Sequence, residues 1–167
     1  YKEVTKDWPL LMKGDTDFPD INEEDIIIDA LFGIGLNRPP KGWIKDLIIH
    51  INSKRAYKLS IDVPSGLYAE KPIEDPEAIV KPNHTLTFQT PKLSFFLPES
   101  GPYVTFYEVL DIGLDEEFME TVEPLAQLIE KPEAQGFYKQ RHKYAHKGNF
   151  GHALIVAGSY GSIGAAV

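Results

Sequence analysis

The sequence contains no cysteine, which excludes disulfides and thiolate metal sites from its 167 residues. Positive charge is also scarce, because 17 lysines and arginines face 25 acidic residues and leave a formal charge of -8. This balance disfavours binding to nucleic acid or to an anionic membrane. No apolar run reaches the roughly 18 residues that a membrane-spanning helix needs. With no secretion signal near Tyr1, these features predict a cytoplasmic protein.

The chain has the composition of a folded globular protein, with 43% hydrophobic and 25% charged residues. Residues 26–33 form an Ile-rich run of strand length, and residues 42–54 carry apolar side chains at helical spacing. A second strand is expected at 57–66, and further strands at 84–90 and 103–113. Strand, helix and strand in this order predict a βαβ unit, and therefore an α/β fold with parallel strands buried on both faces.

The last third of the sequence changes in character. Residues 114–130 are acidic and predict a short helix plus a turn, while residues 131–151 are polar and basic and indicate a linker. Residues 152–167 predict a buried strand, a glycine-rich turn and the first turn of a helix. Because this pattern opens a domain without completing it, we expect the sequence to be a piece of a longer protein. We place the boundary between two domains near Glu130, dividing residues 1–130 from 131–167.

Two aspartates, Asp29 and Asp62, lie toward the carboxyl ends of the first two expected strands. Open α/β sheets bind ligands at the carboxyl ends of their strands, so both carboxylates are expected to face one crevice. Gly33 and Gly35 would let the backbone approach a ligand, and Ser65 adds a hydroxyl. Such oxygens suit a hard cation, and one acid would remain for proton transfer. The alternative is that these residues only form turns or cap helices.

The segments "DALFGIGL", "SIDVPSGL", "TLTFQTPKLSFFLPESG" and "VLDIGL" follow one another within residues 24–114. In wording and order they resemble the carboxyl-terminal half of an NAD(P)H-hydrate epimerase domain. The resemblance implies a Rossmann-like, mostly parallel sheet with flanking helices. It also implies an enzyme that interconverts the R and S epimers of the hydrated cofactors NADHX and NADPHX.

The same resemblance implies roles for individual residues. Asp29 and Ser65 would hold a potassium ion, and Asp62 would bind the substrate and act as acid and base at the epimerised carbon. Further substrate contacts would come from Gly33, Ile34, Gly35, Leu36, Asn37, Arg38 and Pro39. The family's amino-terminal elements, with an asparagine- and glycine-rich loop that adds a potassium ligand, are not recognisable in this sequence.

At the other end, "RHKYAHKGNFGHALIVAGSYGSIGAA" resembles the start of the ADP- or ATP-dependent NAD(P)H-hydrate dehydratase domain. This implies the first strand and turn of a ribokinase-like domain, with ADP or ATP as cosubstrate and Ala165 and Ala166 touching the hydrated nucleotide. Everything after that first turn is missing, so we expect the sequence to be incomplete for both reactions. No Walker A lysine is present, which excludes a P-loop.

Two other classes of function stay open at this point. The chain could be a noncatalytic nucleotide- or partner-binding module, or part of a ribokinase-like small-molecule kinase. Lys92 lies in an irregular loop, where it could reach the phosphates of a nucleotide or be solvated. His142 and His146 have the spacing of a zinc pair but lack a third ligand nearby. The sequence leaves open whether the chain forms a homo-oligomer and which of the two dinucleotides it prefers.

Overall fold

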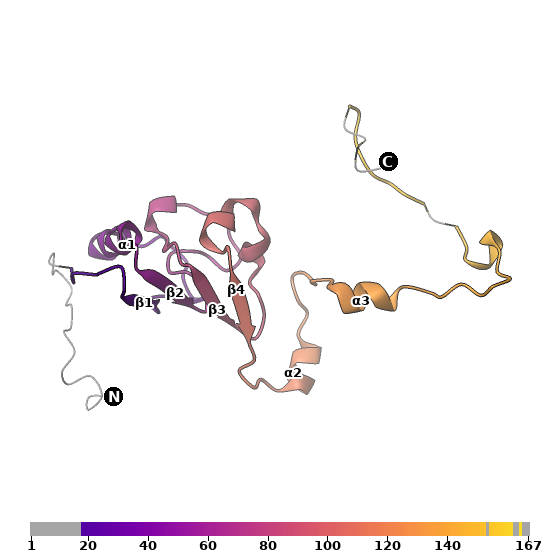
Figure 1. Cartoon of the computed structure of the whole chain (residues 1–167), viewed down its shortest axis with the longest axis horizontal. Coiled ribbons are helices and arrows are strands. Elements are labelled where there is room, and N and C mark those ends of the chain that lie inside the picture. Colours follow the sequence, from indigo (N-terminus) through magenta and orange to yellow (C-terminus); the bar gives the residue numbers. More distant parts are fainter. Residues whose placement is uncertain (1–17, 153, 162–163, 165–167) are drawn as a thin grey trace. The chain divides into compact units, whose positions relative to one another are not determined.

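A computed structural model describes residues 18–152, 154–161 and 164 (Figure 1). The chain divides into two compact units, of which the first ends at Pro124 and the second begins at Leu125. The first unit contains a four-stranded sheet in which all neighbouring strands are parallel and follow the order β1-β2-β3-β4. The predicted α/β fold with a parallel sheet is therefore confirmed. The assignment of residues 1–130 and 131–167 to two functional domains stays a prediction.

The strands are shorter than the sequence predicts. The elements are β1 (Ile26–Asp29), α1 (Trp43–Ser53), β2 (Tyr57–Ile61), β3 (His84–Phe88) and β4 (Tyr107–Leu110).

Two residues that directly follow strands, Asp62 and Gln89, have φ angles of 69° and 60°. This left-handed conformation turns the chain out of the extended path. The strands β2 and β3 therefore end at the residues just before, Ile61 and Phe88.

The hydrophobic core lies on one face of the sheet. Leu47, Ile48 and Ile51 of α1 pack with Val80, and Ile27 of β1 lies against this cluster. A second cluster lies toward the other edge of the same face, where Tyr107 of β4 packs against it. Its buried members are Val63, Leu67, Ile79, Phe95, Tyr103 and Val104.

The opposite face of β1 is uncovered in the described part of the chain. Side chains alternate along a strand, so Ile26 and Ile28 point away from α1, and they are 68% and 64% exposed. The prediction that the strands are buried on both faces is therefore wrong for β1 among the described residues. The physical reason is that α1 and the second core cluster lie on the same side of the sheet.

The segments after β4 are short and exposed. Helix α2 (Glu116–Thr121) confirms the short helix expected in the acidic segment. The predicted linker is not wholly irregular, because it contains α3 (Lys131–Gly136) and a 3-10 turn at Lys147–Asn149. Within the described residues no helix has the length and the apolar character that crossing a membrane requires.

The buried strand predicted near residue 155 is wrong for the described positions. Leu154, Ile155 and Val156 are largely exposed and adopt no strand conformation. An apolar run becomes a buried strand only when neighbouring strands supply hydrogen-bond partners, and no strand among the described residues pairs with this one. Ala165 and Ala166 lie outside the described residues.

Candidate functional site

The site lies at the carboxyl ends of β1 and β2, where both predicted carboxylates are found. Asp29 is the last residue of β1 and pairs in register with Ser60 of β2, and Asp62 follows two positions after Ser60. The parallel pairing thus brings two acids that are distant in the sequence to neighbouring strand ends. This is the edge at which open α/β sheets bind ligands.

Asp29 is buried, and its carboxylate accepts hydrogen bonds from other residues of the protein. One carboxylate oxygen, Oδ2, accepts hydrogen bonds from the Ser60 hydroxyl at 2.7 Å and from the Ser65 backbone N–H at 2.9 Å. The residue is only 2% exposed, so these donors compensate the loss of water around the carboxylate. Asp29 therefore ties the loop after β2 to the end of β1, as the turn-forming alternative anticipates.

Ser65 makes the reciprocal connection to the loop after β1. Its hydroxyl oxygen accepts a hydrogen bond from the Phe32 backbone N–H at 3.0 Å, and the hydroxyl lies 3.5 Å from the Phe32 carbonyl oxygen. The next residue, Gly66, has a φ of 98°, and a Cβ there would come within 1.9 Å of the Ala78 carbonyl oxygen. Only glycine fits this turn, which holds Ser65 in place.

The oxygens around Asp29 fit an alkali cation. The Asp29 carboxylate, the Ser65 hydroxyl and the Phe32 carbonyl are hard oxygen donors that the hydrogen bonds between the two loops bring together. Among the described residues no group of three or more histidines and acids could hold a metal ion. Oxygen donors of this kind suit a hard cation better than a transition metal, which prefers nitrogen and sulfur ligands.

Asp62 has a strained backbone and a partly accessible side chain. Its φ of 69° costs roughly 1 kcal/mol for a residue other than glycine, and such strain is often found at functional sites. The conformation is held by a hydrogen bond from the Asp62 N–H to the Leu86 carbonyl oxygen at 2.6 Å. The side chain is 15% exposed, so a ligand can reach it more readily than Asp29.

One oxygen of the Asp62 carboxylate is held by the end of β3 and the loop that follows. Oδ1 lies 3.2 Å from the Lys92 ammonium and accepts a hydrogen bond from the Phe88 N–H at 3.4 Å. Lys92 is 13% exposed, so it is not the solvated lysine that one alternative anticipated. The sequence did not reveal this ion pair, because the two residues lie on different loops.

The other oxygen of Asp62 faces the glycine-containing loop after β1. A Cβ built on Gly33 would lie 3.0 Å from Asp62 Oδ2, which shows how closely the backbone approaches the carboxylate. Any larger residue at this position would press on Oδ2. Gly33 and Asp62 are therefore brought together as the sequence predicted.

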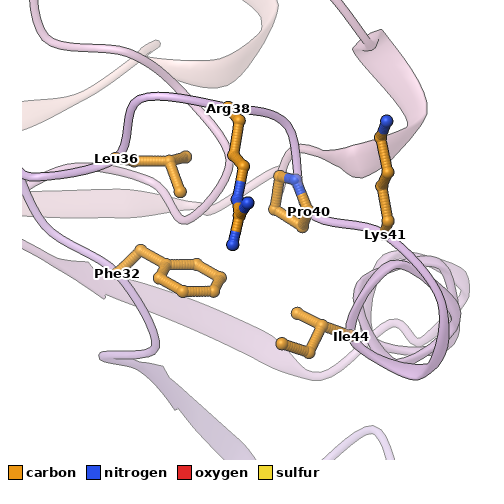
Figure 2. Close-up of a pocket in the computed structure, with 6 residues that line it drawn as sticks. All are labelled: Phe32, Leu36, Arg38, Pro40, Lys41 and Ile44. Carbon is orange, nitrogen blue, oxygen red and sulfur yellow. The ribbon is translucent and has the colours of Figure 1, made fainter.

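A cavity of about 370 Å³ lies between this loop and the start of α1. It is lined by Phe32, Leu36, Arg38, Pro40, Lys41 and Ile44. Figure 2 shows the Arg38 guanidinium between the Phe32 ring and Pro40, whereas the Lys41 amino group is turned away. The walls are mostly apolar and include two cationic residues, Arg38 and Lys41, which suits a ligand with an apolar ring and an anionic group.

Sequence reasoning identified only part of this cavity. Leu36 and Arg38 were predicted as substrate contacts, but Phe32, Pro40, Lys41 and Ile44 were not. Ile44 belongs to the apolar stripe of α1, and it packs against the core cluster as well as lining the cavity. Of the remaining predicted contacts, Ile34, Gly35 and Asn37 are exposed and do not line the cavity.

The family model described as YjeF-related protein N-terminus matches residues 2–94, more than half of the chain. The chain belongs to this family. The matched range includes Asp29, Asp62, Ser65 and Lys92, so the whole strand-end site lies inside the family's domain.

The relatives of this YjeF-related chain include long bifunctional enzymes. It is 35% identical over 157 residues to the bifunctional NAD(P)H-hydrate repair enzyme Nnr of Coxiella burnetii, covering 94% of this chain and 30% of the relative. It is 33% identical over 141 residues to the Escherichia coli enzyme of the same name, covering 84% of this chain and 27% of that enzyme. For the Hyperthermus butylicus enzyme the identity is 35% over 147 residues, covering 87% and 25%. The chain thus spans less than a third of these relatives.

Proposed function

We propose that the first unit is part of an NAD(P)H-hydrate epimerase that interconverts the R and S epimers of NADHX and NADPHX. Family membership and the names of the relatives support this assignment. The observation that carries it is the Asp62 carboxylate, which has one oxygen paired with Lys92 and the other turned toward Gly33. A carboxylate placed in this way is suited to move a proton at a bound ligand.

The chemistry assigned to Asp62 follows from what epimerisation requires. Inverting the hydrated ring carbon means that a bond at this carbon breaks and re-forms, with a proton removed and returned. Asp62 Oδ2 would accept this proton as a base and give it back as an acid. The strained backbone and the Gly33 contact would keep the carboxylate in reach of the ring.

The cavity beside the loop would bind another part of the same substrate. Phe32, Leu36 and Ile44 offer apolar surface to a ring, and Arg38 offers a cation to a phosphate. Asp29 and Ser65, with the Phe32 carbonyl, would hold a potassium ion, which when bound would supply positive charge that orients substrate oxygens. The chain's own contribution is to fix these oxygens through the hydrogen bonds between the two loops.

A second function is proposed for the part of the chain after residue 130. The relatives are named as bifunctional, and the similarity to the Coxiella burnetii enzyme covers 94% of this chain, well beyond the residues that the family model matches. Residues 131–167 would then begin an NAD(P)H-hydrate dehydratase domain that uses ADP or ATP. In it Ala165 and Ala166 would contact the hydrated nucleotide.

The decisive experiment follows the R epimer of NADPHX by chromatography with the natural protein that contains this sequence. We expect conversion to an R and S mixture, faster with potassium than with choline in its place. Asp62→Asn should abolish most of this conversion, whereas Asp46→Asn, an exposed aspartate on α1, should not. A wild-type protein that binds NADPHX and leaves the R epimer unchanged would instead support the noncatalytic module.

A further inference from the structure

The two oxygens of the Asp62 carboxylate have different surroundings. Oδ1 is held by the Lys92 ammonium and by the Phe88 N–H. Within the described residues no hydrogen bond reaches Oδ2, which instead faces the backbone of Gly33. A freely rotating carboxylate would exchange its two oxygens, whereas contacts on Oδ1 alone favour the orientation in which Oδ2 faces Gly33.

Lys92 has the contacts needed to do so. Its ammonium donates to the Phe88 and Thr90 carbonyl oxygens, both at 2.9 Å, and lies 3.2 Å from Asp62 Oδ1. A lysine ammonium has three N–H donors; the two carbonyl oxygens take two of them, and the contact with Asp62 is an ion pair. These contacts hold the ammonium at the end of β3, next to the Asp62 carboxylate.

The end of β3 is shaped to hold this lysine. Gln89 has a φ of 60°, which turns the backbone between Phe88 and Thr90, and both flanking carbonyl oxygens accept from Lys92. The same segment directs the Phe88 N–H to Asp62 Oδ1. One turn of the backbone thus provides a direct donor to the carboxylate and the two acceptors that fix the lysine.

We propose that Lys92 is a positioning residue for Asp62. It holds Oδ1 through the ammonium, so that Oδ2 alone is presented to the ligand beside Gly33. This role rests on the proposed epimerase function of Asp62. Lys92 touches neither the substrate nor the reacting carbon in this scheme and acts only through the carboxylate.

The test compares the Lys92→Met variant with the wild-type natural protein in the NADPHX assay. Methionine keeps a long, unbranched side chain but removes the ammonium. We expect kcat to fall on the order of 10-fold to 100-fold with KM nearly unchanged, because a poorly oriented base loses rate rather than binding. Lys92→Arg should recover part of the rate. The matched control is Lys45→Met, which breaks the 2.8 Å ion pair between Lys45 and Asp75 elsewhere in the unit and should leave kcat unchanged.

A second measurement does not depend on turnover. In the substrate-free protein, Lys92→Met should shift the amide NMR signals of Gly33 and Phe88, the two backbone neighbours of the Asp62 carboxylate. Lys45→Met should leave both signals in place. Unmoved signals in Lys92→Met would overturn the positioning role even in an inactive protein.

The kinetic outcomes separate this inference from the function on which it rests. An active wild type whose Lys92→Met variant keeps its kcat refutes the role of Lys92 and leaves the epimerase assignment standing. A raised KM at constant kcat also refutes it, because it would mean that Lys92 binds substrate. A wild type without activity refutes the epimerase assignment, and the role of Lys92 in that reaction is refuted with it.

Discussion

The ends of β1 and β2 carry one aspartate each, and the two carboxylates have opposite surroundings. Asp29 is 2% exposed and accepts hydrogen bonds from Ser60 and Ser65. Asp62 is 15% exposed, and only one of its oxygens is held by described residues. An aspartate near the end of each of two neighbouring strands is thus fully hydrogen-bonded within the protein in one case and left partly available to a ligand in the other. The donors supplied by the following loops make this difference.

The largest expected effect tests Asp62, the carboxylate with one oxygen left for a ligand. Asp62→Asn should lower kcat for NADPHX epimerisation by about 10²-fold to 10⁴-fold, because the amide cannot act as a base. The free energy of unfolding should fall much less, because the amide has the size of the carboxylate and its oxygen can still accept the hydrogen bond from the Phe88 N–H. Steady-state kinetics and urea denaturation measure both quantities. An Asp62→Asn variant that keeps most of its kcat but loses much of its free energy of unfolding would contradict this contrast between the two aspartates.

The next largest effect tests Asp29, the carboxylate that is buried and hydrogen-bonded within the protein. Asp29→Ala should reduce the free energy of unfolding by about 2–4 kcal/mol, because it leaves the buried Ser65 N–H and Ser60 hydroxyl without an acceptor. Urea denaturation in the absence of potassium measures this structural contribution by itself. Asp62→Ala is the matched comparison and should cost clearly less stability. Equal losses in the two variants would remove the distinction.

A smaller effect on kcat is expected when a larger side chain is placed next to Asp62 Oδ2. Gly33→Ala adds a methyl group about 3.0 Å from Asp62 Oδ2. We expect kcat to drop on the order of 10-fold, because a displaced carboxylate aligns poorly with its substrate. Gly35→Ala is the control, since a Cβ at Gly35 would meet nothing within 4 Å. Equal kinetics in both variants would show that the Gly33 contact has no part in orienting Asp62.

The smallest effect concerns an ion pair outside the site. The hydrogen bond from Lys45 holds the pKa of Asp75 below its usual value of 3.8. A carboxyl group with a lowered pKa in the folded state contributes stability that is present above 3.8 and is lost as the pH falls through the lower folded value. Lys45→Met should weaken this small dependence in acid unfolding curves and leave epimerase activity intact, because backbone hydrogen bonds from Glu77 and Ala78 still lower the pKa of Asp75. A change in kcat would mean that the pair acts on the site.

Some of this site could be predicted from the sequence. The apolar runs and the helical spacing between them predict neighbouring parallel strands, and this placed Asp29 and Asp62 at one edge. The partners of the carboxylates could not be predicted in the same way. Lys92 reaches Asp62 only because Gln89 turns the chain after β3, and no local signal marks a left-handed glutamine.

The sequence by itself determined the order of strands and helices, because hydrophobic periodicity is a property of neighbouring residues along the chain. It also determined which residue types stand at the strand ends. Only the tertiary structure decided that one aspartate is buried among donors and the other is held at a single oxygen, because those partners come from distant loops.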